Sequence, residues 1–135
     1  MAFELHRDPG LSCIAASAMA AQTVVTWDVA DVQAQVLAVA TVNVEPIGLT
    51  RSVASSAGDA VTVYDDDHIV KAVAAASLGA GADIGVASTN GALGAVTAGA
   101  SGVVKWRLGK SVTAAAAGET FSLSIKPRQL SGLLP

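Results

Sequence analysis

Apolar and polar residues alternate over several short stretches of this chain, and helical periodicity is hard to find. A period of two places successive side chains on opposite faces of a strand, and β-branched residues favour that conformation. Residues 120–126 illustrate the pattern, because Phe121, Leu123 and Ile125 fall on one face and hydroxyl side chains on the other. The same reasoning predicts strands at 23–27, 36–44, 60–64, 69–73, 84–87, 103–108 and 120–126.

Turn residues separate these stretches at short intervals. They lie at 57–59, 65–67, 79–81, 89–91, 98–99 and 117–119. Short strands with regular turns indicate an all-β fold, here a small single-domain β-barrel or sandwich of short antiparallel strands. The alanine tracts at 74–76 and 114–117 are short and lie beside glycine or β-branched residues, so we expect loops there rather than helices. We expect an extended N-terminal arm at 1–22, the barrel domain at 23–128 and a C-terminal tail at 129–135.

The composition predicts a thin core. Hydrophobic residues make up 52% of the 135 residues but aromatics only 4%, so the apolar content is mostly alanine and valine. Small side chains each remove little apolar surface from water, at roughly 25 cal/mol per Å². Charged residues are also sparse, at 14%. Such a domain gains stability by burying further surface against partner subunits.

Two segments of the sequence resemble each other. The stretch Thr50–Val63 reads as a basic residue, Ser-Val, small residues, Ala-Gly-acid and an alternating strand, and Gly109–Leu123 has a similar order. The glycine suits a tight turn with positive φ. Two copies are too few for a solenoid, so we expect two related β-hairpins within one small barrel.

The order and spacing of several of these motifs resemble the small head-decoration proteins of tailed bacteriophages. The resemblance covers about residues 47–126 and rests on these segments: Pro46-Ile47-Gly48-Leu49, Ala57–Val63, Leu78–Asp83, Asn90-Gly91 and Ala114–Glu119 before the last alternating strand. It implies a β-barrel-like structural protein of the virion, without enzymatic activity. Such a protein binds the outer surface of the major capsid lattice and stabilises it, usually as a homotrimer, after synthesis in the host cytoplasm.

Charge is distributed unevenly along the chain. Ten of the eleven acids lie at or before Asp83, and five of the eight basic residues follow it. Those five are Lys105, Arg107, Lys110, Lys126 and Arg128. Alternation places Lys105 and Arg107 on one strand face, and pairing of 103–108 with 120–126 would bring all five cations to one edge. This edge is either a solvated surface or a contact for acidic groups on a capsid or a neighbouring subunit.

Four apolar residues are further candidates for capsid or subunit contacts. Phe3, Leu5 and Leu11 lie in the expected arm, and we expect part of that arm to order on a capsid or a neighbouring subunit. Trp27 lies outside the segment that resembles decoration proteins, and aromatic residues are common interface anchors. The net charge of −3 gives no case for nucleic-acid binding, and no stretch is long and apolar enough to predict a membrane span.

Chemical motifs are absent or incomplete in this sequence. Residues 79–85 look like a dinucleotide-binding loop, but the glycines that follow disfavour the required helix. Asp65–His68 reads as a solvated turn, because three adjacent carboxylates cannot all face one ion. Cys13 is the single cysteine and is expected to be buried and inert. We therefore expect no cofactor, no metal and no enzyme. A β-barrel module that binds glycans or host surfaces is the alternative, and a small enzyme with an unrecognised site is a third possibility.

Overall fold

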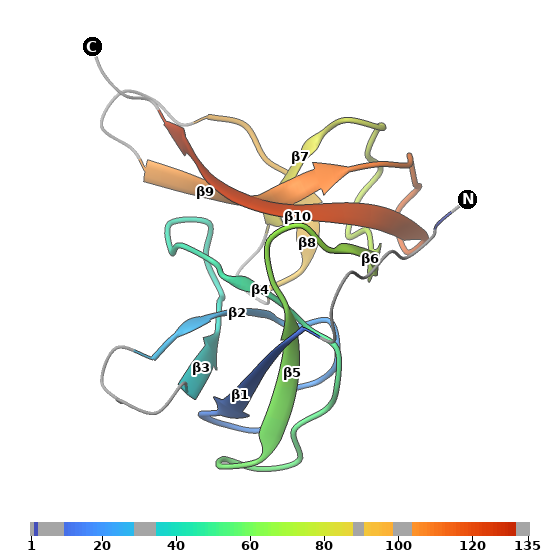
Figure 1. The fold of residues 1–135 in the computed structure, drawn as a ribbon. Helices are drawn as coiled ribbons and strands as arrows, with labels where there is room; N and C mark the ends of the chain where they lie inside the picture. The colour runs from blue at the N-terminus through green and yellow to red at the C-terminus, as the bar shows by residue number, and fades with distance from the viewer. Residues whose placement is uncertain (1, 3–9, 29–34, 88–90, 99–103, 132–135) are drawn as a thin grey trace.

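The computed structural model describes residues 2, 10–28, 35–87, 91–98 and 104–131, and these contain ten strands and no helix (Figure 1). The expected all-β class is therefore confirmed. The strands are β1 (Leu11–Ala15), β2 (Val24–Trp27), β3 (Gln35–Ala38), β4 (Gly48–Thr50), β5 (Ala60–Tyr64), β6 (Ile69–Val73), β7 (Asp83–Val86), β8 (Leu93–Ala95), β9 (Val104–Ser111) and β10 (Thr120–Ser131).

The strands form two sheets rather than one barrel. β1 to β5 close into a barrel in the order β1-β3-β2-β4-β5, and β6 to β10 form a second sheet in the order β6-β10-β9-β7-β8. In Figure 1 the first half of the chain lies below the long β9 and β10 strands of the second half. The expected small β-barrel is present in the first half, and the second half adds a sheet of its own.

The two halves have the same strand order and the same register. Met19 bridges Ala54 in the first half, and Leu78 bridges Ala115 in the second. Just after β6, Ala74 forms a parallel bridge with Leu93 of β8, which brings the two outer strands of the second sheet together. β3 pairs in parallel with β1 in the corresponding place in the first half. The chain therefore contains two copies of one five-stranded unit.

Buried side chains repeat in the same way. The interior of the first half is made of Cys13, Ala15, Met19, Val25, Val36, Ala54, Val61 and Val63. The residues at the equivalent positions of the second half are Ala72, Ala74, Leu78, Ile84, Leu93, Ala115, Phe121 and Leu123, all of them buried. The sequence predicts Phe121, Leu123 and Ile125 on one apolar face, and all three are fully buried. Equivalent interior positions of the two units are therefore both apolar, and several of them carry a larger side chain in the second unit.

The first half buries one outer face against the second half. Val24, Leu49 and Tyr64 lie side by side on β2, β4 and β5, and they belong to the same buried cluster as the interior of the second half. The equivalent positions on β7, β9 and β10 are Asp83, Lys110 and Ser124, which are polar and at least partly exposed. The first unit therefore packs this apolar outer face against the second unit, whereas the equivalent outer face of the second unit is polar.

A buried hydroxyl joins strand and turn in each unit. The hydroxyl of Thr50 donates to the Ala20 carbonyl at 2.9 Å and accepts from the Thr23 amide at 2.9 Å. In the second half, the hydroxyl of Ser111 donates to the Gly79 carbonyl at 2.6 Å and accepts from the Ala82 amide at 3.0 Å. Thr50 and Ser111 are thus equivalent. The internal repeat read from the sequence aligns Ser52 with Ser111, because each follows a basic residue and precedes a valine. The structure instead makes Thr50 equivalent to Ser111, a shift of two residues at this end of the repeat.

The predicted boundaries need two corrections. Residues 11–22, expected within an extended arm, form β1 and the turn that follows it, because alternate residues of β1 enter the interior of the first half. Residues 129–131, expected within a tail, extend β10 against β9. The remaining predicted arm residues at 1 and 3–9, and residues 132–135, lie outside the described part of the chain. The two alanine tracts are not helical, as expected.

Candidate interaction surfaces

The four apolar residues predicted to make contacts differ in whether the structure describes them and in how exposed they are. Phe3 and Leu5 lie outside the described residues. Leu11 is the first residue of β1 and packs, half-buried, against the interior of the first half, so its main role is structural. Trp27 ends β2 and keeps 41% of its surface exposed, which is the largest exposed aromatic surface among the described residues.

The five predicted cations all lie on β9 and β10, and the register places three of them on a shared face. Arg107 is directly opposite Arg128, and Lys105 is directly opposite Leu130, so Lys105, Arg107 and Arg128 share one face. Lys110, three residues further along β9, lies directly opposite Asp83 of β7 and Ser124 of β10. The gathering of the five cations on one hairpin is therefore confirmed, whereas their meeting at one edge stays a prediction.

A bulge in β10 gives Lys126 a separate role. The register shifts between Ile125 and Arg128, so one extra residue of β10 lies opposite β9. The ammonium of Lys126 lies 3.0 Å from the carboxylate of Asp67, with both side chains exposed. An exposed pair of this kind contributes little to stability.

Arg107 is engaged within the protein itself. Its guanidinium Nη1 lies 2.7 Å from the Asp83 carboxylate, and its Nε donates to the Lys126 carbonyl at 3.2 Å. Only 14% of the Arg107 side chain is exposed. The charges on this face that remain available to a partner are therefore those of Lys105 and Arg128. We call the surface formed by Lys105, Arg107 and Arg128 the cationic face.

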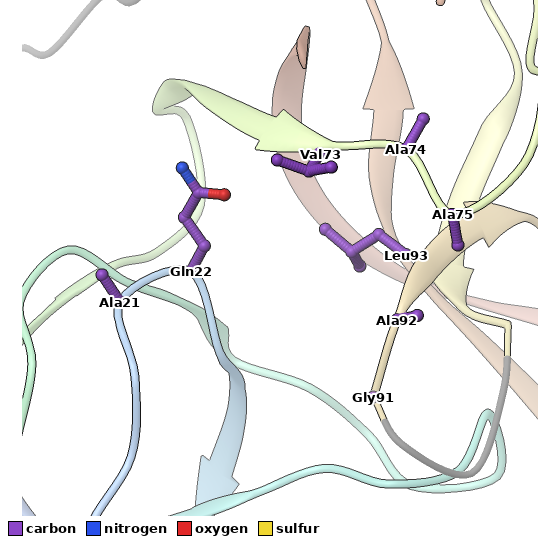
Figure 2. Close-up of a pocket in the computed structure, with 8 residues that line it drawn as sticks. All are labelled: Ala21, Gln22, Val73, Ala74, Ala75, Gly91, Ala92 and Leu93. Atoms are coloured by element: carbon purple, nitrogen blue, oxygen red, sulfur yellow. The ribbon is translucent and has the colours of Figure 1, made fainter. Parts of the chain in front are cut away.

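A groove runs along the junction of the two halves. Three adjoining cavities of about 280, 270 and 360 Å³ share the turn residues Ala21 and Gln22. Figure 2 shows the middle cavity, where the Gln22 side chain extends from its turn toward β6 and Val73, while Ala92 and Leu93 form the other wall. We call this the junction groove. Sequence reasoning missed it, because its walls come from both halves.

Titratable groups in the described part of the chain do not form a reactive cluster. His68 is buried beside the Tyr64 ring, and its Nδ1 lies 3.3 Å from the Asp65 carboxylate. Burial, with a smaller contribution from the Asp65 charge, raises the pKa of the Cys13 thiol above its ordinary value. Within the described residues no three His, Cys, Asp or Glu side chains are placed to hold a metal ion. Nor does this part of the chain contain a helix able to span a membrane.

Comparison with known proteins gives a structural match. No protein-family model matches the sequence, and no curated protein matches it. Among solved structures, the fold is similar to that of the head fiber gp8.5 N base in bacteriophage phi29, with a TM-score of 0.63 and 16% sequence identity. The match covers 86% of this chain and 92% of that chain. At this identity the likeness concerns the fold, so this chain shares its all-β architecture with a protein of a phage head.

Proposed function

We propose that this chain is a structural protein of a phage head, which binds the outer surface of the major capsid lattice and stabilises it without enzymatic activity. The observation that carries the proposal is the structural likeness to a head fiber base over 86% of the chain. The resemblance of residues 47–126 to head-decoration proteins supports the same role from the sequence.

The cationic face is the surface that we assign to capsid binding. Lys105 and Arg128 project from the β9–β10 hairpin beside Arg107, whose charge is balanced by Asp83. Charges at the rim of an interface mainly steer association, and salt screens them over about 8–10 Å. Acidic groups on the capsid would therefore be recognised most strongly at low ionic strength.

The test is reconstitution on capsids of the same phage that lack this protein. We expect the wild-type protein to occupy them in saturable fashion, and the Lys105→Glu, Arg128→Glu double variant to bind roughly tenfold more weakly at low salt. Lys110→Glu is the matched control, since it changes the same charge on the same strand at a position that pairs with Asp83 and Ser124. Full-strength binding by the double variant at every salt concentration would remove the cationic face from the proposal. Failure of the wild-type protein to bind would refute the function.

We further propose that the protein assembles on the capsid as a homotrimer. The thin, alanine- and valine-rich core supports this assignment, because subunit contacts would bury additional apolar surface. Light scattering of the purified full chain measures the oligomeric mass directly. A monomer at all concentrations, with unchanged thermal stability, would contradict the trimer while leaving capsid binding open to its own test.

A further inference from the structure

The backbone at Gln22 is strained, whereas the equivalent turn of the second half is not. Gln22 has a φ of 62°, in the left-handed region that disfavours side chains, whereas the equivalent residue in the second half is Gly81, with a φ of 78°. Both residues make the same backbone bond, from the Gln22 amide to the Thr50 carbonyl and from the Gly81 amide to the Ser111 carbonyl, each 2.8 Å. Glycine would thus suffice for the fold, and a function for the Gln22 side chain would explain its presence.

The Gln22 side chain occupies the centre of the junction groove. It lines all three cavities, and no other residue of the described chain bonds to its carboxamide. A carboxamide offers both a donor and an acceptor to a ligand. Backbone strain often occurs where a binding site requires it.

One end of the groove is positively charged. The cavity beside Gln22 is also lined by Arg51 and Lys71. The guanidinium of Arg51 lies 5.8 Å from the centre of the Tyr64 ring, and none of the described carboxylates forms an ion pair with it. The position equivalent to Arg51 in the second half is Val112. The cation, like the glutamine, is thus a feature of the junction and not of the repeated fold.

We propose that the junction groove binds an extended acidic peptide segment of a partner protein. A carboxylate of the peptide would meet Arg51, the Gln22 carboxamide would bond its backbone, and small apolar side chains would lie along the walls at Ala92 and Leu93. A glycan fits less well, because glycan sites commonly offer an exposed aromatic face for stacking, whereas Arg51 lies over the buried Tyr64 ring. This site is separate from the cationic face and does not depend on the proposed capsid function.

Fluorescence anisotropy with labelled peptides tests the proposal. The probes are short peptides of alternating alanine and glutamate, the same peptides with glutamine in place of glutamate, and an oligogalacturonate as an acidic glycan. We expect the glutamate peptide to bind the full-length protein best and to shift the Gln22 side-chain amide signal in NMR spectra. Arg51→Val and Gln22→Gly, each the residue of the second half, should weaken binding roughly tenfold or more.

Two controls keep the outcome interpretable. Gln22→Gly should not lower the thermal midpoint, because glycine relieves the strained turn, so its loss of binding cannot be attributed to unfolding. The Lys105→Gln, Arg128→Gln variant should retain peptide binding, since it alters only the cationic face. Equal binding by wild type and Arg51→Val, preference for the oligogalacturonate, or loss of binding only in the Lys105→Gln, Arg128→Gln variant would each overturn the proposal.

Discussion

Replacing the buried hydroxyl of each unit should destabilise the protein by a calculable amount. Thr50→Val keeps the volume of the side chain but removes one donated and one accepted hydrogen bond. A net contribution of about 0.5–1.5 kcal/mol for each bond predicts a loss of about 1–3 kcal/mol. Ser111→Ala removes the equivalent two bonds and should cost a similar amount. Both side chains are buried, so water cannot replace these bonds.

Equilibrium unfolding in urea, followed by tryptophan fluorescence, measures these losses, and the chain supplies its own controls. Thr50→Ser introduces the residue of the second half and keeps both bonds, so it should lose only the contribution of a methyl group, about 1 kcal/mol or less. The double variant Thr50→Val, Ser111→Ala should lose the sum of the two single effects, because the sites lie in separate units. If Thr50→Val unfolds like the wild type, or if Thr50→Ser costs as much as Thr50→Val, the hydroxyl does not stabilise the turn.

Three further outcomes follow from the packing. Gly109→Ala should prevent folding, because the new Cβ would clash with the backbone carbonyl oxygen of Ser124, and soluble yield with circular dichroism reports this. Arg107→Gln should lower the unfolding free energy by about 1–3 kcal/mol and Lys126→Gln by less than about 1 kcal/mol, measured in urea, because the first pair is more buried. Cys13 should react with thiol reagents only on unfolding. Since burial raises its pKa in the folded state, the stability that it contributes should fall as pH rises above the ordinary value of 9.0.

Several strands could be predicted because their pattern is local. Residues 60–64, 69–73 and 120–126 alternate clearly, and all three lie within strands of the structure. By contrast, β4 and β8 have only three residues each and contain glycine, so no period can be read from them. The valine-rich run at 36–44 stops being a strand after Ala38, because the later residues cross to the second half, where the Val42 carbonyl accepts from the Trp106 amide at 2.8 Å.

The interaction surfaces depend on features that a sequence does not display. Clustering of the cations on one hairpin could be predicted, but the bulge in β10 and the ion pair between Arg107 and Asp83 could not. The junction groove requires knowledge of which turn meets which strand across the two halves. A correct alignment of the halves would have provided one signal, namely Gln22 at the position of Gly81.

The polar end of the second unit limits how far this architecture can extend. Where the first unit presents Val24, Leu49 and Tyr64 to its neighbour, the second presents Asp83, Lys110 and Ser124. A third unit docking there in the same way would have to desolvate the Lys110 ammonium and the ion pair between Asp83 and Arg107. These three residues therefore act as a terminal cap, like the polar capping units of repeat proteins. An apolar trio at these positions would instead offer a further unit the same docking surface that the first unit offers the second.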